Sequence, residues 1–170
     1  MAAMLEIIHS GEATPSAEQV AQRADVGLRT VFRHFQDMDS LYREMSVVIE
    51  GELRTVAALP FRSEDWRDRV VELIDRRALA FEKTGPFLRA SAAFRYRSKH
   101  LQADNTRLVA ALRERLKRQL PPEVARDHLK VEILDLLISF ESWSRLRREQ
   151  GLSPKRARET LAAAVRRLLG

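Results

Sequence analysis

The residues with the clearest chemistry lie close together in one short stretch, Leu28 to His34. Arginine, threonine and histidine side chains donate hydrogen bonds to phosphate oxygens and base edges, and an exposed aromatic ring can lie along a sugar-phosphate strand. A helix here that buries Val31 and Phe35 leaves six residues on its outer side: Leu28, Arg29, Thr30, Phe32, Arg33 and His34. Together these side chains form a surface suited to a nucleic acid.

Two short helices joined by a tight turn are needed to position this surface. Ser16 and Gln19 have the spacing of a capping box, which predicts that a first helix begins at Ala17. Asp25 falls in the turn that follows, where the backbone needs a left-handed conformation that Asp tolerates better than most residues. We expect Val26 to fill the angle between the helices. The inner side of the first helix is expected to hold Ala17, Val20, Ala21 and Ala24.

The rest of the chain is predicted to be helical as well. Glycine and proline are few and stand where helices should stop, and apolar residues between them recur three and four apart. Alternating strand patterns are missing, so we expect an all-α fold. One predicted helix runs from Trp66 to a break at Gly85-Pro86, and a second begins at Pro86. A third passes through Leu101 and Leu116 and ends at Pro121-Pro122. A fourth covers about residues 123–149, and the last begins at Ser153-Pro154.

The predicted helix of about residues 123–149 is apolar on more than one face. Its two stripes consist of Leu129, Ile133, Leu136, Phe140 and Trp143, and of Val131, Leu134 and Ile138. A helix that is apolar nearly all round must be covered on several sides. In so short a chain, we expect a second subunit to provide one of the covers.

Composition argues against several other classes of protein. The chain has no cysteine, which excludes disulfides, thiol catalysis and thiolate metal sites. Its four histidines lack ligand spacing, and no phosphate loop or nucleophile elbow accompanies them, so we expect no metal, no cofactor and no enzyme. No apolar run approaches the roughly 18 residues of a membrane span, and the N-terminus does not resemble a signal peptide. A cytoplasmic protein is expected.

The formal net charge of +6 is distributed unevenly. Residues 1–50 hold four basic side chains against eight acidic ones, so the remaining residues carry the whole excess. Nucleic-acid binding depends on where the charges lie rather than on their sum. Arg89, Arg95 and Arg97 follow Phe87 closely and are candidates for binding an anionic effector, although solvated arginines are common in this chain.

The run from Ser16 to Met45 resembles the DNA-binding segment of TetR-family transcriptional regulators. Small, turn, aliphatic and aromatic residues follow the first short helix of that segment in a fixed order. This chain matches the order at Ala24, Val26, Thr30, Val31, Phe32, His34, Phe35 and Leu41. The resemblance covers about residues 5–45, whereas the rest of the chain agrees with the family in length and in its all-α pattern.

The resemblance implies two domains and a function. Residues 1–46 correspond to a three-helix helix-turn-helix domain, and residues 47–170 to a helical domain for effector binding and dimerisation. The implied protein is a transcriptional regulator, a repressor that binds a palindromic double-stranded DNA operator and is released by a small-molecule effector. Its homodimer is expected to form through the last two long helices.

The resemblance also implies roles for individual residues. Leu28, Arg29 and Thr30 are expected to face base edges or nearby phosphates, Phe32 to contact the DNA backbone, and Arg33 and His34 to reach a base or phosphate. Ser16, which caps the preceding helix, is expected to meet a phosphate. Phe81, Phe94, Phe140 and Trp143 are candidates for lining the effector pocket, although each alone also fits a core position.

Three features depart from the family pattern. Asp25 replaces the usual glycine, and Asp39 stands where a phosphate-contacting lysine is common. The first helix is expected to be short or truncated, without the basic arm that usually precedes it. These departures leave an alternative open, a helical homodimeric module that binds a small molecule or a protein and carries a degenerate DNA-binding head.

Overall fold

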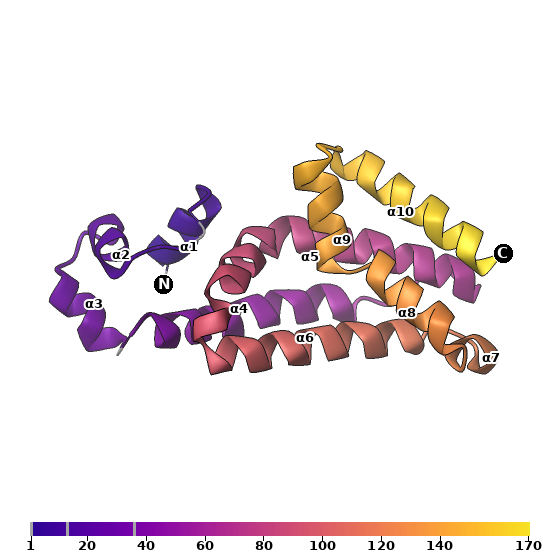
Figure 1. Ribbon diagram of the computed structural model, residues 1–170, viewed down its shortest axis with the longest axis horizontal. Coiled ribbons are helices and arrows are strands. Elements are labelled where there is room, and N and C mark those ends of the chain that lie inside the picture. Colours follow the sequence, from indigo (N-terminus) through magenta and orange to yellow (C-terminus); the bar gives the residue numbers. More distant parts are fainter. Residues whose placement is uncertain (1, 13, 36) are drawn as a thin grey trace. The chain divides into compact units, whose positions relative to one another are not determined.

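The computed structural model describes residues 2–12, 14–35 and 37–170, and every regular element in these ranges is helical, which confirms the all-α prediction (Figure 1). The α-helices are α1 (Ala2–His9), α2 (Ala17–Arg23), α3 (Leu28–His34), α4 (Met38–Ala58), α5 (Trp66–Phe94), α6 (Lys99–Lys117), α7 (Pro122–Ala125), α8 (His128–Leu137), α9 (Phe140–Ser144) and α10 (Pro154–Leu169). A 3-10 turn, η1 (Arg95–Arg97), precedes α6, and a π-helical turn, η2 (Arg145–Glu149), follows α9.

The helices form two compact units, which are described separately below. The first unit combines residues 1–54 with residues 84–107, and the second combines residues 55–83 with residues 108–170. Helices α4, α5 and α6 each contribute residues to both units. The functional division near residue 46 stays a prediction.

One hydrophobic core joins α2 and α3 to the rest of the first unit. Its fully buried members come from α1 to α6 and are Met4, Ile7, Ile8, Val20, Ala21, Val31, Leu41, Tyr42, Met45, Ile49, Phe87, Ala90 and Leu101. Helices of seven residues, the length of α2 and α3, are not stable in isolation. The apolar area removed from water in this core is therefore what holds the two short helices in place.

Helix α5 continues through Gly85-Pro86, so the predicted break at this pair is wrong. Proline lacks an N–H, and within a helix this leaves the carbonyl four residues earlier without its usual donor. Phe87 and Ala90, in the turn that follows Pro86, are both buried in the core of the first unit. Burial of this helix face offsets the local cost of Pro86. The positions of glycine and proline in the sequence do not reveal this tertiary contribution.

The single helix predicted over about residues 123–149 is also wrong, because this segment forms α7, α8, α9 and η2. Asp127 begins α8 by accepting a hydrogen bond from the Lys130 backbone N–H at 3.0 Å. Ser139 begins α9 by accepting one from the Ser142 backbone N–H at 3.2 Å. Short polar side chains of this kind satisfy the free N–H groups of a new helix and so favour a restart.

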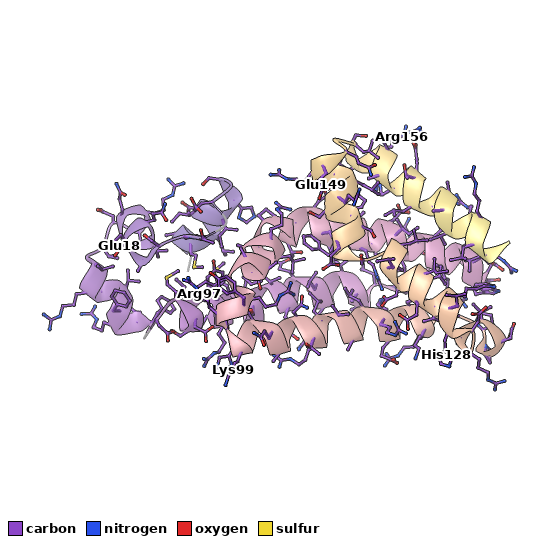
Figure 2. All side chains as sticks on the ribbon, viewed as in Figure 1. Glu18, Arg97, Lys99, His128, Glu149 and Arg156 are labelled. Atoms are coloured by element: carbon purple, nitrogen blue, oxygen red, sulfur yellow. The ribbon has the colours of Figure 1, made fainter. Side chains whose placement is uncertain are left out.

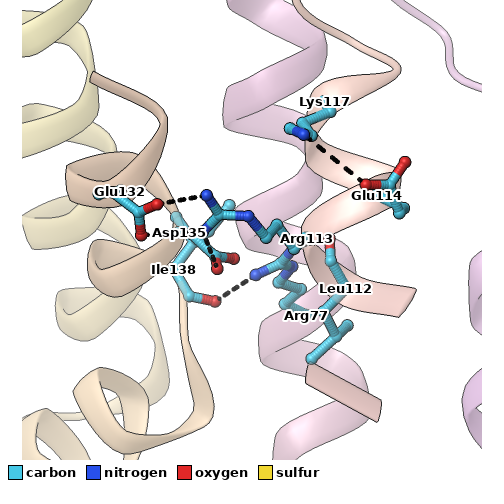
Figure 3. A network of polar contacts seen from close by, with 8 residues as sticks. All are labelled: Arg77, Leu112, Arg113, Glu114, Lys117, Glu132, Asp135 and Ile138. Atoms are coloured by element: carbon cyan, nitrogen blue, oxygen red, sulfur yellow. Dashed lines mark hydrogen bonds and ion pairs between the residues drawn. The ribbon is translucent and has the colours of Figure 1, made fainter. Parts of the chain in front are cut away.

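A buried arginine occupies the break between α8 and α9. Arg77 donates one hydrogen bond to the Ile138 carbonyl at 2.8 Å and another to the Leu112 carbonyl at 2.6 Å (Figure 3). Burial lowers the pKa of Arg77 to about 10, while Asp135 acts in the opposite direction, so the guanidinium remains protonated at neutral pH. The carbonyl at the helix break thus accepts a hydrogen bond from the buried guanidinium, so each polar group gains a partner inside the second unit.

A second arginine links the surfaces of α6 and α8. Arg113 donates to Glu132 at 2.9 Å and to Asp135 at 3.3 Å (Figure 3). The hydrogen bond that Arg113 donates to Glu132 is the largest cause of the raised pKa of Arg113. Together Arg77 and Arg113 fix α8 against its neighbours in the second unit. The orientation of α8 determines which of its apolar faces points outward.

Candidate nucleic-acid interface

A capping box starts α2, as the spacing of Ser16 and Gln19 predicted. The Gln19 backbone N–H donates to the Ser16 hydroxyl oxygen at 3.2 Å, and the Ser16 backbone N–H donates to the Gln19 side-chain carbonyl at 2.7 Å. The pKa of Glu18 is lowered by a hydrogen bond from its own backbone amide and then by one from Ser16. The Ser16 hydroxyl is therefore engaged beside a carboxylate, which opposes a phosphate at this point, and its predicted phosphate contact remains untested.

The turn from α2 to α3 has the left-handed residue that the sequence predicts. Asp25 has φ 52°, and among the described residues it is the one non-glycine residue with a positive φ. The Val26 backbone N–H donates to the Ala21 carbonyl at 3.0 Å, which closes the turn against the end of α2. This hydrogen bond and the left-handed step at Asp25 set the direction in which α3 begins.

Two small apolar residues predicted to be internal are instead on the surface. Ala24 is exposed, and Val26 exposes 41% of its surface rather than filling the angle between the helices. The inner faces are made by Ala17, Val20 and Ala21 of α2, which are buried as predicted. Small residues allow α3 to approach α2 closely, and the turn residues are then pushed to the outside.

The outer side of α3 carries the six residues singled out from the sequence. Val31 is the buried residue of this helix, and Phe35 just beyond it is half-buried. Five of the six predicted contact residues are exposed, and Thr30 is half-buried: Leu28, Arg29, Phe32, Arg33 and His34 make up the exposed set. Phe32 alone leaves 47% of its surface in solvent. The structure therefore brings all six onto one helix, and the seventh predicted contact residue, Ser16, lies at the N-cap of α2.

The guanidinium groups of α3 differ from their neighbours in having no acidic partner. Arg23 pairs with Glu6 at 3.1 Å, and Arg43 pairs with Asp39 at 3.8 Å. Within the part of the chain that the structure describes, Arg29 and Arg33 form no ion pair. The acidic excess of the N-terminal segment consequently leaves these two cations uncompensated by direct contact. Both remain available to an external anion.

The four aromatic residues proposed for an effector pocket belong to two different units. Phe81 and Phe140 meet edge to face with ring centroids 5.4 Å apart, and the buried Trp143 lines the same interior of the second unit. Phe94 belongs to the first unit, where it stacks on Tyr42 with centroids 4.9 Å apart. The interior around Phe81 and Trp143 leaves no space for a water molecule among the described side chains. Phe81 and Trp143 are buried, whereas Phe140 and Phe94 are half-buried.

A pair of interactions around Trp143 was missed in the sequence. The indole N–H donates to Glu82 at 3.0 Å, and Arg147 donates to the same carboxylate at 2.8 and 2.9 Å. The sequence separation of more than sixty residues, 61 for Trp143 and 65 for Arg147, hides this cluster from any local pattern. Burial of an indole that needs a hydrogen-bond partner was the available signal.

No group of three or more His, Cys, Asp or Glu residues within residues 2–12, 14–35 and 37–170 is arranged to hold a metal ion. None of the models of known protein families matches the chain, and no curated protein or solved structure matches it either.

The left-handed turn predicts an asymmetry between two substitutions at one position. Asp25→Gly should leave the free energy of unfolding within about 1 kcal/mol of the unchanged protein, because glycine adopts this φ without strain. Asp25→Val should lower it by about 1–2 kcal/mol, because a β-branched residue is strained at positive φ. Urea denaturation followed by circular dichroism measures both. Equal stability of the two variants would contradict a fixed left-handed turn.

Proposed function

We propose that the protein is a sequence-specific double-stranded DNA-binding transcriptional regulator of the TetR type. The observation that carries the proposal is the outer side of α3, which presents Arg29, Arg33 and His34 beside the exposed ring of Phe32. Arginine recognises the acceptor pair of guanine bidentately, and threonine or histidine contacts bases or phosphates. A short helix held outward by a tight turn has the form that enters the major groove.

The electrostatics of α3 support the same proposal. Breaking an exposed ion pair costs up to about 1 kcal/mol, so a partner is bound somewhat more easily by cations that are not already paired. Arg29 and Arg33 meet this condition among the described residues of the N-terminal segment, whereas Arg23 and Arg43 do not. Phosphate and base contacts are accordingly assigned to α3 rather than to the whole basic content of the segment.

A homodimer belongs to the proposal, since a palindromic operator requires two reading helices. On α8, Val131 and Leu134 are buried, whereas Leu129 and Leu136 expose 72% and 65% of their surfaces. With Ile133 they form a stripe spaced four and three residues apart, the spacing of a helix-packing seam. The outer side of α10 is rich in arginine, so we assign the main apolar contact of the dimer to α8.

Release by a small-molecule effector completes the proposal. A ligand can drive release only if it binds the non-binding conformation more tightly. Phe81 and Trp143 line an interior without room for a water molecule, and Phe140 packs against Phe81, so an effector held there must separate these side chains. The proposal thus assigns the effector to a rearranged form of the second unit.

A second candidate function rests on the charge of the head. Residues 1–50 contain twice as many acidic as basic side chains, and two of the four cations are paired internally. A helical homodimer that binds a small molecule or a protein, with a head that no longer reads DNA, is compatible with this balance. Selection of duplexes from a random DNA pool with the full chain separates the two candidates, because only the first predicts an enriched sequence.

The assignment of α3 predicts a selective effect of Arg33→Ala. Affinity for the selected duplex should fall at least about tenfold, since one arginine contact to a base edge accounts for about 1–3 kcal/mol of discrimination. The free energy of unfolding should change by less than about 0.5 kcal/mol, because the side chain is exposed. Fluorescence anisotropy and urea denaturation measure the two quantities.

Arg126→Ala is the matched control for this change, because Arg126 is also exposed but lies in the second unit. It should leave the affinity for the selected duplex close to that of the unchanged protein. Equal loss of affinity in both variants would indicate a general charge effect and would count against a reading role for α3.

The assignment of the dimer contact predicts that Leu136→Lys shifts the protein from dimer to monomer in analytical ultracentrifugation. An ammonium group enclosed in an apolar interface without a partner costs several kcal/mol. Leu79→Lys is the control, because Leu79 is comparably exposed on α5 and lies outside the stripe. A dimer that survives Leu136→Lys, or an unchanged chain that is monomeric at high concentration, would contradict the assignment.

A further inference from the structure

A second basic surface lies in the first unit, between α5 and α6. Five of the six residues from Arg95 to His100 are basic or aromatic, and we call this segment the basic turn. Tyr96 exposes 71% of its surface, and Arg97, Lys99 and His100 are also exposed. The guanidinium of Arg97 lies over the Tyr96 ring, 5.1 Å from its centroid. Figure 2 labels Arg97 and Lys99 on this segment.

The basic turn is held firmly at both ends. Phe94, directly before it, stacks on Tyr42 of α4 with the two rings 13° from parallel. Leu101, directly after it, is buried in the core that also contains Val31 of α3. Within the turn, the hydroxyl oxygen of the buried Ser98 accepts a hydrogen bond from the Leu101 backbone N–H at 3.1 Å. The Ser98 backbone N–H donates to the Arg95 carbonyl at 3.1 Å. The exposed cations therefore project from a backbone that is anchored to the same core as α3.

The cations of the basic turn have no acidic partner in the part of the chain that the structure describes. Among the described residues, Arg95, Arg97 and Lys99 form no ion pair. The acidic residue nearest in sequence, Asp104, pairs with Arg107. Three cations on one short segment repel one another, and a bound anion relieves that repulsion. This combination points to an anionic partner.

The charge balance of the first unit indicates what the turn offsets. Residues 1–54 contain five basic and nine acidic side chains, whereas residues 84–107 contain five basic side chains and one acidic side chain, Asp104. The deficit of the first segment equals the excess of the second. A DNA-binding unit with an acidic head needs cations elsewhere on the same rigid body to attract phosphates.

We propose that the basic turn is a second DNA contact, which binds phosphates of the duplex backbone while α3 reads the bases. The inference rests on the proposed function and assigns to Arg95, Arg97 and Lys99 the sequence-independent part of the affinity. Phosphates suit these residues because guanidinium and ammonium groups form charge-assisted hydrogen bonds with them. Tyr96 has a hydroxyl that can donate to a phosphate and a ring that can pack on a sugar.

The salt dependence of DNA binding tests this inference. The triple variant R95Q/R97Q/K99Q of the full chain removes the three charges and keeps polar side chains, and the hydrogen bonds that Arg95 accepts use its backbone carbonyl. Binding of a selected duplex is measured by anisotropy over a series of salt concentrations. The slope of log affinity against log salt should become shallower by about 2 to 3, since each phosphate contact contributes about 0.9.

The control variant R118Q/R126Q/K155Q removes the same charge from exposed sites of the second unit and should leave the slope unchanged. An unchanged slope in R95Q/R97Q/K99Q, with α3 variants still defective, would overturn the inference and leave the proposed function standing. Failure of the unchanged protein to bind any duplex would overturn both.

A membrane surface is the rival partner of a basic turn that carries an exposed tyrosine. Vesicles of equimolar phosphatidylcholine and phosphatidylserine provide the comparison, with binding measured by co-sedimentation. We expect the unchanged protein and R95Q/R97Q/K99Q to bind these vesicles equally weakly. Vesicle binding that the triple variant alone loses, with an unchanged DNA slope, would reassign the turn to an anionic membrane.

Discussion

The direction of α3 depends on one left-handed backbone step at Asp25 and on the close approach that small residues allow at the end of α2. Helices α2 and α3 are too short to be stable in isolation, and α3 contributes one buried side chain, Val31, to the core. Nearly all of its remaining surface is consequently free for contact with a partner. A longer or more deeply buried helix would be more stable and would have fewer side chains to offer.

Charge is the second constraint on the first unit. Acidic side chains predominate in its N-terminal segment, and some of the few cations there form ion pairs with them. The free cations gather at two places that share one hydrophobic core, the outer side of α3 and the basic turn. In the proposed function, the first place supplies selectivity and the second supplies affinity. Such a division is physically reasonable because base contacts and phosphate contacts make different energetic contributions.

The local features of the helix pair were predictable from the sequence, because they depend on neighbouring residues. The capping box of Ser16 and Gln19, the left-handed Asp25 and the exposed face of α3 all follow from short-range geometry. The exposure of Val26 was not predicted, since it depends on how closely α3 packs on α2. Features set by distant contacts were also missed, as in the continuous α5 at Pro86 and the breaks near Asp127 and Ser139. Arg77 shows why, because its partners lie 35 and 61 residues away in sequence.

Hydrogen–deuterium exchange of the full chain, with and without a long DNA duplex at low salt, tests the central claim most directly. Deuterium uptake in the peptide that covers residues 28–34 should be slower when DNA is present, because bound DNA covers α3 and stabilises its hydrogen bonds. Unchanged uptake in this peptide, under conditions where DNA binding is saturated, would contradict the claim that α3 is the DNA-reading element.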